Sequence, residues 1–375
     1  MDSSQYDYIF VGASPLMCLH AAALADRYKV LLLDDRSAIG GVWQSGTFDG
    51  KEFPCAVPHM LEPHPGVYDF LEQHLDLEME DVTEHSHVAF TGELLGQKLH
   101  PYTRYLLHTV LTESSFNQVK QAEAQGLTYQ ILVDNSYRQQ PTIYDNYRPR
   151  NASTLTVKYM RGGTSALRIA LENKLKQSGC DICLDSAVES MTINDGDVSL
   201  NLNNKNTVTG KNTYFAQHSV PNKIFNSSSE LVPTTYTTEQ NNSTLQLKIR
   251  VKNAQKFFYL YFPISPYIYI ASRLDYYSDE HDPEVVYIAV TMRTRVEGFS
   301  NELLQMIISE LVKTGVLSDD ACIENFQTVQ ESRKRFELAD MINLSLISEG
   351  KVKVVTSTKT GGLARGIYDN MLAFS

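Results

Sequence analysis

The sequence predicts an α/β protein in which one parallel sheet is assembled from separate parts of the chain and a second, mixed α+β domain contains an antiparallel sheet. Three observations predict this fold. Two apolar runs, 8–11 and 29–33, flank a helical stretch near the start. Alternating and aromatic-rich strands fill residues 244–294, and another apolar strand follows at 351–355. Continuous apolar runs are typical of buried parallel strands, whereas alternation is typical of antiparallel ones.

Length, charge and composition restrict the possible classes of protein. The 375 residues exceed what one hydrophobic core usually accommodates, so two packed regions are expected. The formal net charge of −11 argues against a nucleic-acid partner, because phosphate binding needs clustered Lys and Arg. The polar start at 1–5 and the lack of a long apolar run predict neither a signal peptide nor a membrane span. We therefore expect a cytoplasmic protein.

Cysteine and histidine spacing predicts neither a disulfide framework nor a metal site. The five cysteines are few and scattered. Cys180 and Cys183 have CxxC spacing, but they lie at the start of a predicted strand rather than at a helix N-terminus, which favours free thiols over a redox pair. His85, His87 and the other histidines are interpreted as surface residues.

The N-terminal region has the order of elements of a dinucleotide-binding unit. The first apolar run ends at Gly12, a helical stretch covers 16–26, and the second apolar run ends in Asp34 and Asp35. In such units the glycine turn and the helix N-terminus approach a pyrophosphate, and the terminal acid accepts hydrogen bonds from ribose hydroxyls.

The glycine turn departs from the usual motif. Residues 12–17 read Gly-Ala-Ser-Pro-Leu-Met, which keeps the first glycine and places Ser14 and Met17 where the other two are expected. Ser14 is small, and its hydroxyl can donate to a phosphate. Met17 occupies the position that normally permits close packing of helix and strand. We expect Gly12, Ser14 and Pro15 to contact the cofactor.

The next segment suggests which dinucleotide is bound. Residues 34–43 read Asp-Asp-Arg-Ser-Ala-Ile-Gly-Gly-Val-Trp, which resembles the acid and Gly-Gly segment of the flavin amine oxidase and UDP-galactopyranose mutase superfamily. The resemblance implies a Rossmann-like FAD-binding domain, with Asp34 at the ribose and Arg36 near the phosphates. The cofactor-binding residues that it implies in this segment are Asp34, Asp35, Arg36, Gly40, Gly41, Val42 and Trp43.

Two later segments resemble other parts of the same FAD-binding domain. Residues 158–167 resemble the Gly-Gly segment and helix that open its second part, and Val188 matches a valine whose backbone faces the adenine. Near the end, the pair 357–358 is Ser-Thr where the superfamily has Gly-Asp, and hydroxyls can replace that Asp at the ribityl chain. The resemblance implies three residues beside the isoalloxazine: Gly361, Gly362 and Leu363.

Candidate catalytic and substrate residues are fewer. Residues 58–71 resemble a mutase segment in which a histidine lies at the flavin, so His59 is the catalytic candidate. Residues 96–102 resemble a mutase-type hairpin that opens the substrate domain. Arg273 is a candidate partner for a substrate diphosphate, and Tyr269 is a candidate for a pocket wall. The aromatic strands can either line such a pocket or fill the core.

The predicted domain organisation is discontinuous. We expect FAD-binding parts at 1–57, 155–225 and 341–375, a helical part of the substrate domain at 58–154, and the antiparallel sheet with its helix at 226–340.

Three functions agree with these patterns. The first is an FAD-dependent oxidoreductase that oxidises a C–N or C–C bond of a small organic molecule by hydride transfer to flavin N5. The second is a mutase-like enzyme in which reduced flavin attacks a sugar nucleotide. The third is a binding or escort protein that has a degenerate FAD site and no flavin. For all three we expect a small-molecule ligand, and a homodimer is possible.

Overall fold

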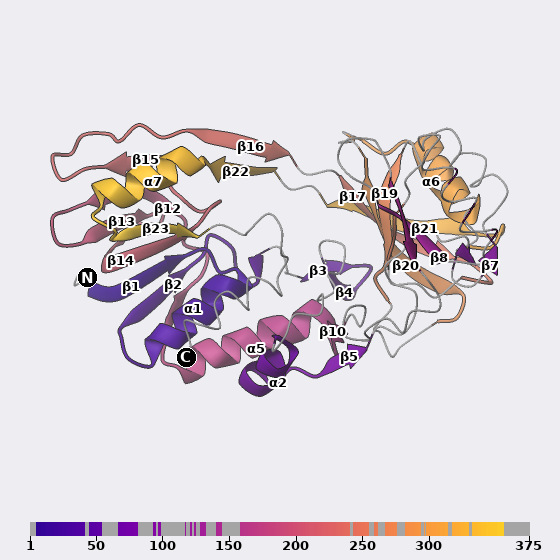
Figure 1. Cartoon of the computed structure of the whole chain (residues 1–375), viewed down its shortest axis with the longest axis horizontal. Helices are drawn as coiled ribbons and strands as arrows, with labels where there is room; N and C mark the ends of the chain where they lie inside the picture. Colours follow the sequence, from indigo (N-terminus) through magenta and orange to yellow (C-terminus); the bar gives the residue numbers. More distant parts are fainter. Residues whose placement is uncertain are drawn as a thin grey trace.

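The computed structural model describes most of the two predicted regions. The described residues are 5–41, 45–54, 67–81, 93–94, 97–98, 117, 121, 124, 128–132, 140–144, 158–240, 243–254, 259–261, 267–275, 282–293, 296, 298–313, 317–329 and 332–355. They form a first body built on a parallel sheet and a second body built on an antiparallel sheet (Figure 1). Among these residues, no helix has both the length and the apolar character needed to cross a membrane.

The sheet of the first body is assembled from three separate parts of the chain. Its central strand β1 (Gln5–Val11) pairs in parallel with β2 (Val30–Leu33), which in turn pairs in parallel with β11 (Asp181–Cys183). On its other side β1 pairs in parallel with β14 (Thr207–Ala216), and β14 pairs in parallel with β23 (Val352–Val355). This arrangement confirms the predicted discontinuous α/β fold.

A three-stranded antiparallel meander leads into this sheet. Strands β12 (Val188–Ile193) and β13 (Val198–Leu202) pair antiparallel, and β13 pairs antiparallel with the first half of β14. The second half of β14 then pairs with β23. A short strand, β15 (Lys223–Phe225), lies parallel to β12. The long strand β14 therefore belongs to both the meander and the parallel sheet.

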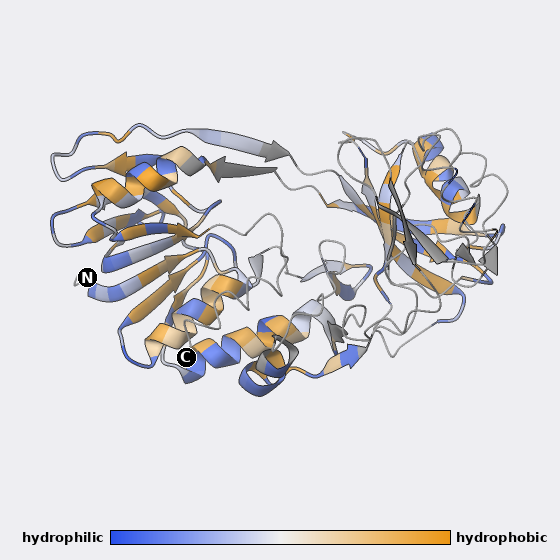
Figure 2. Cartoon of the chain, in the orientation of Figure 1, coloured by the Kyte–Doolittle hydropathy of each residue, from blue (hydrophilic) through white to orange (hydrophobic). Residues whose placement is uncertain are grey.

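Helices α1 (Pro15–Ala25), α5 (Gly163–Gln177) and α2 (Val67–Leu75) cover one face of the sheet (Figure 1). Buried leucines at 167, 171 and 175 recur every fourth residue of α5, which places them on one side of the helix toward the sheet. On the opposite face, α7 (Leu338–Ile347) packs on the sheet and the meander. Figure 2 shows apolar residues concentrated in the strands and the facing sides of these helices.

The second body contains the predicted antiparallel sheet. Its strand order is β18 (Tyr259–Tyr261), β19 (Ile268–Arg273), β20 (Val285–Met292), β17 (Thr244–Arg250) and β21 (Cys322–Val329). Side chains alternate along β20: 286, 288, 290 and 292 join the core that packs against α6 (Asn301–Lys313), and 285, 287 and 289 face the other way. The alternation read from the sequence thus separates two buried faces.

A hairpin packs on the face of this sheet that lies away from α6. Its strands are β3 (Ser45–Phe48) and β4 (Lys51–Pro54). Asp49 and Gly50 form the turn with φ angles of 51° and 76°, the left-handed pair that a tight hairpin requires. Phe48 joins a buried cluster with Tyr287 of β20. The segment that directly follows the predicted Gly-Gly motif therefore contacts the second body.

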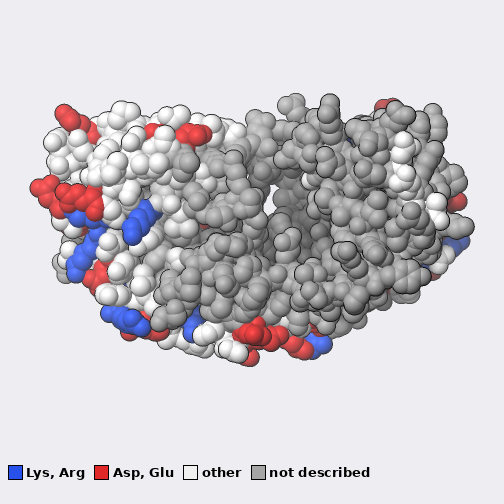
Figure 3. All heavy atoms as spheres, in the orientation of Figure 1, with Lys and Arg blue, Asp and Glu red and all other residues white. Residues whose placement is uncertain are grey.

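The remaining strands form short antiparallel pairs. Strands β16 (Tyr236–Gln240) and β22 (Ser332–Phe336) run together between the two bodies (Figure 1). The others are β5 (Met79–Asp81) with β10 (Lys158–Met160), β6 (Glu93–Leu94) with β7 (Gln97–Lys98), and β8 (Thr128–Leu132) with β9 (Gln140–Tyr144). On the face seen in Figure 3, described Lys and Arg side chains are interspersed with Asp and Glu.

Candidate cofactor site

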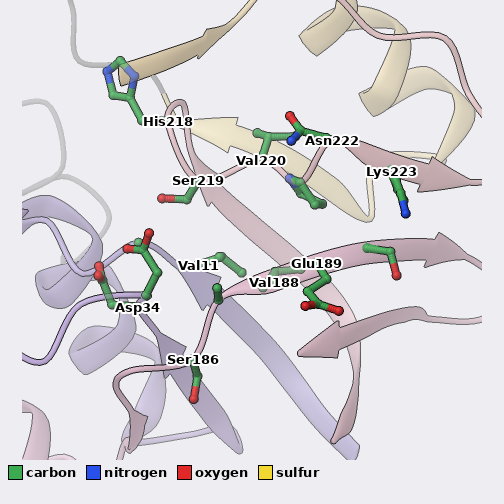
Figure 4. Close-up of a pocket in the computed structure, with 15 residues that line it drawn as sticks. Val11, Asp34, Ser186, Val188, Glu189, His218, Ser219, Val220, Asn222 and Lys223 are labelled. Atoms are coloured by element: carbon green, nitrogen blue, oxygen red, sulfur yellow. The ribbon is translucent and has the colours of Figure 1, made fainter. Parts of the chain in front are cut away.

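A cavity of about 530 Å³ opens at the carboxyl ends of β1 and β2 in the first body (Figure 4). The edge formed by the carboxyl ends of parallel strands is where open α/β sheets bind ligands. Four parts of the chain contribute to its wall. They supply Val11, Gly12, Asp34, Asp35, Ser186, Ala187, Val188, Glu189, Ser190, His218, Ser219, Val220, Pro221, Asn222 and Lys223.

Gly12 ends β1 in a conformation that only glycine adopts easily. Its φ is +103°, and its amide donates to the Leu33 carbonyl at 2.8 Å. A Cβ at this position would lie 2.6 Å from Ala216 Cβ and 2.7 Å from Ser219 Oγ. The lack of a side chain therefore permits the turn after β14 to approach the end of β1. Gly12 and Ser219, which both line the cavity, therefore lie next to each other.

Asp34, at the end of β2, is bound by the backbone on both carboxylate oxygens. Ala13 donates its amide to Oδ2 at 2.5 Å, and Arg36 donates its amide to Oδ1 at 2.9 Å. Only 7% of Asp34 is exposed. Burial raises the pKa of Asp34 and the neighbouring Asp35 carboxyl raises it further, although the two amide hydrogen bonds act in the opposite direction. Asp35 is exposed and lines the same cavity.

The N-terminus of α1 begins directly after the glycine turn. Ser14 is the N-cap residue and Pro15 the first helical residue, where a missing N–H costs least. The first helical hydrogen bond runs from the Cys18 amide to the Ser14 carbonyl at 2.9 Å, so the amides of Leu16 and Met17 precede the helical ladder. Such amides, together with the helix dipole, suit a phosphate group.

The Met17 side chain does not occupy the cavity wall. It is 1% exposed and belongs to the core between the sheet and helices α1, α2 and α5. Leu71 of α2 and Leu167 of α5 lie in the same core. Met17, which replaces the third glycine of the motif, therefore packs among the helices on one face of the sheet. It is not among the residues that line the described cavity.

The predicted Gly-Gly segment folds back onto the glycine turn. Gly40 donates its amide to the Ala13 carbonyl at 2.8 Å, and Arg36 Nη1 donates to the Gly41 carbonyl at 3.1 Å. Gly41 has a φ of +56°, and a Cβ there would lie 3.3 Å from Ser14 Cα. The structure thus brings the predicted residues of segments 12–15 and 34–41 together.

Val188 lies across the cavity from these segments, where β12 begins. The chain before it is held to the end of β2 by two backbone hydrogen bonds. Ser186 donates its amide to the Asp34 carbonyl at 2.9 Å, and Asp185 donates its amide to the Arg36 carbonyl at 3.0 Å. Val188 is therefore placed on the same cavity as the acidic residues at the end of β2.

Several wall residues were not anticipated from the sequence. His218, Ser219, Asn222 and Lys223 come from the turn after β14 and from β15 (Figure 4). The only sequence signal near them is the Val-Pro pair at 220–221, which follows β14. These four residues reach the cavity because β14 pairs in parallel with β1. That pairing joins distant parts of the chain, so no local sequence pattern predicts it.

Other predicted site residues lie elsewhere. Arg273, on β19 of the second body, donates from Nε and Nη2 to the carboxylate of Asp275 at 2.7 and 2.9 Å. Tyr269 lies on the same strand, with the Arg293 guanidinium 5.9 Å from its ring centre. The predicted residues His59, Val42, Trp43, Gly361, Gly362 and Leu363 fall outside the described residues.

The described thiols are free. Cys180 is buried and Cys183 is partly buried on β11. Burial raises the pKa of Cys180 to about 12, which disfavours the thiolate needed for redox exchange. Within the described residues, no group of three or more His, Cys, Asp or Glu side chains is arranged to hold a metal ion.

A parallel sheet from discontinuous segments, a β-meander and an antiparallel second body together form a Rossmann-type fold that is also found in solved structures of putrescine oxidase and UDP-galactopyranose mutase. The chain is similar to a reduced UDP-galactopyranose mutase, with a TM-score of 0.60 and 11% identity over 93% of this chain and 87% of that one. It is similar to putrescine oxidase bound to putrescine, with a TM-score of 0.57 and 12% identity over 99% of each chain. A Rab GDI from Plasmodium falciparum matches with a TM-score of 0.50 and 12% identity over 99% of each chain.

At such identities the likeness establishes the fold. No protein-family model matches the chain. No curated protein sequence matches it either.

Proposed function

We propose that the chain is an FAD-dependent oxidoreductase that oxidises a small organic substrate, such as an amine or an amino acid, by hydride transfer to flavin N5. The observation that carries this proposal is the cavity at the carboxyl ends of β1 and β2, where Gly12, two carboxylates and Val188 converge. Its volume of about 530 Å³ lies in the range of ligand sites and suits the adenosine half of a dinucleotide.

The residues around the cavity fit the adenosine and pyrophosphate part of FAD. The Leu16 and Met17 amides at the start of α1, with the Ser14 hydroxyl, would hold the pyrophosphate. The carboxylates at the end of β2 would hold the ribose hydroxyls, and the backbone at Val188 would face the adenine. When bound, FAD supplies the hydride acceptor, and the chain binds and orients it.

The residues expected beside the flavin ring are predicted from the sequence alone. His59 stays a prediction as the residue beside the flavin, and the segment 361–363 stays a prediction as the wall of the isoalloxazine. Tyr269 and Arg273 stay candidates for substrate binding in the second body, and in the described structure the Arg273 guanidinium is held by Asp275.

The test is to purify the full chain, record its absorption spectrum and titrate it with FAD. We expect flavin bands or FAD uptake, and at about 100 times its Kd FAD should raise the free energy of unfolding by about 2.7 kcal/mol. FMN is the matched control, because it lacks the adenosine that the cavity would bind. A colourless chain that takes up no FAD, or that binds FMN as tightly as FAD, contradicts the proposal.

A mutase-like activity is the second candidate. It is supported by the likeness to UDP-galactopyranose mutase and by the β6–β7 hairpin, which overlaps the start of the predicted mutase-type segment at 96–102. Release of hydrogen peroxide with an amine or amino-acid panel supports the oxidase. Interconversion of a UDP-sugar by the chemically reduced protein supports the mutase.

A binding or escort protein without flavin is the candidate from another class. Ser14 replaces a motif glycine, and Gly12 serves the close approach of the chain's own turn at Ala216. A Rab GDI shares the fold, and a fold by itself does not make a chain an enzyme. A chain that folds, stays colourless and cannot be reconstituted with FAD supports this candidate.

A further inference from the structure

We propose that the outer side of helix α7 is a docking surface for a basic, amphipathic helix of a partner protein. The apolar residues of this surface are Ala339, Ile342, Leu346 and Ile347, all of them exposed. Figure 2 shows α7 on the outside of the first body, with apolar residues along its length. None of the four residues lines the described cavity, so the docking surface is independent of flavin binding.

Helix α7 has apolar residues on two opposite sides. On the inner side, Met341 and Leu344 are buried in the core that the helix forms with the sheet and the meander. On the outer side, Ile342 is 57% exposed, Leu346 is 71% exposed and Ile347 is 47% exposed. Ile342 and Leu346 are four residues apart, so they are neighbours on the helix surface. The helix therefore exposes an apolar stripe in addition to the one that it buries.

Helix α6 shows what an ordinary surface helix exposes. It also packs one apolar side against its own sheet. Its described exposed residues are Asn301, Glu302, Gln305 and Met306, of which one is apolar. A surface helix normally directs polar residues outward, and contiguous exposed apolar surface is typical of interaction sites. The outer side of α7 therefore has the composition of a surface that another molecule covers.

The charge of the α7 segment restricts which molecule that is. Residues 337–350 contain three acids, Glu337, Asp340 and Glu349, and no Lys or Arg. The Glu349 side chain is 80% exposed, and it follows the last turn of the helix, which contains Leu346. The helix dipole adds partial negative charge at this same end. A cation placed beside the apolar stripe is therefore favoured, and an anion is disfavoured.

Basic residues near the segment leave this end negative. The Lys351 ammonium lies 3.4 Å from the Glu349 carboxylate, but its side chain is only 21% exposed and it also donates to the Asp195 carbonyl. Residues 333–335 are basic, but β22 leads them into the opposite, N-terminal end of the helix. A helix of this length spans about 15 Å, which exceeds the screening length of about 8 Å at physiological salt. Salt therefore screens these bases from the exposed Leu346.

This charge pattern favours one kind of occupant. A second copy that paired through the same face would place two acidic α7 segments against each other. An anionic membrane surface would be repelled for the same reason. A helix whose apolar side is flanked by Lys or Arg meets both requirements, because its apolar side chains cover the stripe and its cations face Glu349 and the end of α7.

The experiment uses the full chain and a fluorescently labelled amphipathic peptide built of Leu and Lys at helical spacing. The same peptide with Glu in place of every Lys is the charge control. Fluorescence anisotropy at about 0.15 M salt measures the binding of each. We expect the Lys peptide to bind at least about 10-fold more tightly than the Glu peptide. Glu349→Gln should weaken binding of the Lys peptide and reduce its dependence on salt.

The double variant Ile342→Gln with Leu346→Gln tests the apolar contact. Glutamine has nearly the helix propensity of leucine and adds no charge, and both positions are exposed, so the variant should melt like the unchanged chain. It should bind the Lys peptide about 10-fold or more weakly, because two apolar side chains are lost from the contact. Met306→Gln is the matched control, since it makes the same kind of change at a residue of α6 that is 45% exposed.

Loss of binding in the double variant, with unchanged binding in Met306→Gln, supports the docking surface. The proposal is wrong if the Lys peptide does not bind, binds the double variant equally well, or binds no better than the Glu peptide. Sedimentation velocity and vesicles of phosphatidylcholine with phosphatidylserine test the other two occupants. A dimer or vesicle binding that the double variant abolishes would overturn the proposal in favour of a second copy or a membrane.

Discussion

The Asp49 carboxylate lies 2.9 Å from the Lys248 ammonium and accepts a hydrogen bond from the Tyr287 hydroxyl at 3.0 Å. Asp49 is at the tip of the β3–β4 hairpin, and its two partners are on β17 and β20. At the other end of the hairpin, the Ser45 hydroxyl lies 2.7 Å from that of Thr164 on α5. One hairpin therefore connects the helical layer of the first body to the sheet of the second.

The first prediction concerns pH. Hydrogen bonds from Lys248 and then Tyr287 lower the pKa of Asp49. A lowered pKa in the folded state means that the ionised carboxylate stabilises the fold above the ordinary aspartate pKa of about 3.9, and that this contribution is lost as the pH falls through the lowered value. Asp49→Asn should therefore lower the melting temperature at neutral pH, and the difference from the unchanged chain should shrink below about pH 4.

The size of this effect should be modest, because the side chains of Lys248 and Asp49 are 24% and 26% exposed and solvent screens the pair. Thermal unfolding followed by circular dichroism between pH 3 and pH 7, roughly the range over which carboxylates titrate, measures it. A difference that stays constant across the range would show that the pair does not contribute through its charge.

The second prediction concerns the apolar contact of the same hairpin. Phe53 is 4% exposed, and its ring centre lies 4.8 Å from that of Tyr287. Phe53→Ala removes a buried aromatic side chain and should lower the free energy of unfolding by about 3–5 kcal/mol. Phe326→Ala is the control, because Phe326 is 41% exposed on β21 and should change stability by no more than about 0.5 kcal/mol. Denaturant unfolding compares the two, and equal losses would contradict the docking of the hairpin.

The elements that the sequence predicts well are those whose own residues carry the pattern. Strands β1 and β2 and helix α1 have strong apolar signals. The observed ends of α1 and β2 lie within one residue of the expected ones, and β1 begins three residues before the expected apolar run. Strand β21 was not anticipated, because its residues are exposed or only partly buried and show no clear apolar alternation. It is held by pairing with β17, which is a property of the partner rather than of its own sequence.

The residues of the candidate site also fall into a group that the sequence predicts and a group that it does not. Gly12 and Asp34 were predicted because strand, turn and acid follow one another in the chain. Ser219 and Lys223 were not, because they reach the cavity through the pairing of β1 with β14, which joins Val11 to Phe215.

The third prediction concerns Gly12. Alanine there would hold φ near +103° and bring its Cβ within 2.7 Å of the Ala216 Cβ and Ser219 Oγ atoms. We expect Gly12→Ala to destabilise the chain by about 2–5 kcal/mol from backbone strain and overpacking together, and to weaken FAD binding. Gly196→Ala is the control, since nothing lies within 4 Å of a Cβ at that position. If Gly12→Ala unfolds and binds like the control, the close approach at the end of β1 is not required.

The fourth prediction separates structure from substrate binding at Arg273. Its side chain is 10% exposed and that of Asp275 is 6% exposed, so the ion pair is buried. Asp275→Ala removes a carboxylate that holds a buried guanidinium through two nitrogens, and it should lower the free energy of unfolding in denaturant by up to about 3–5 kcal/mol.

Replacement of both residues by apolar side chains, Arg273→Met with Asp275→Leu, should be less destabilising than Asp275→Ala, because the single variant keeps the buried guanidinium charge but takes away the Asp275 carboxylate. If the double variant is as unstable as the single one, the pair does not act through its charges. A stable double variant then tests the substrate role directly: turnover that falls while FAD binding is retained supports Arg273 as a substrate residue, and unchanged turnover assigns it to the structure of the second body alone.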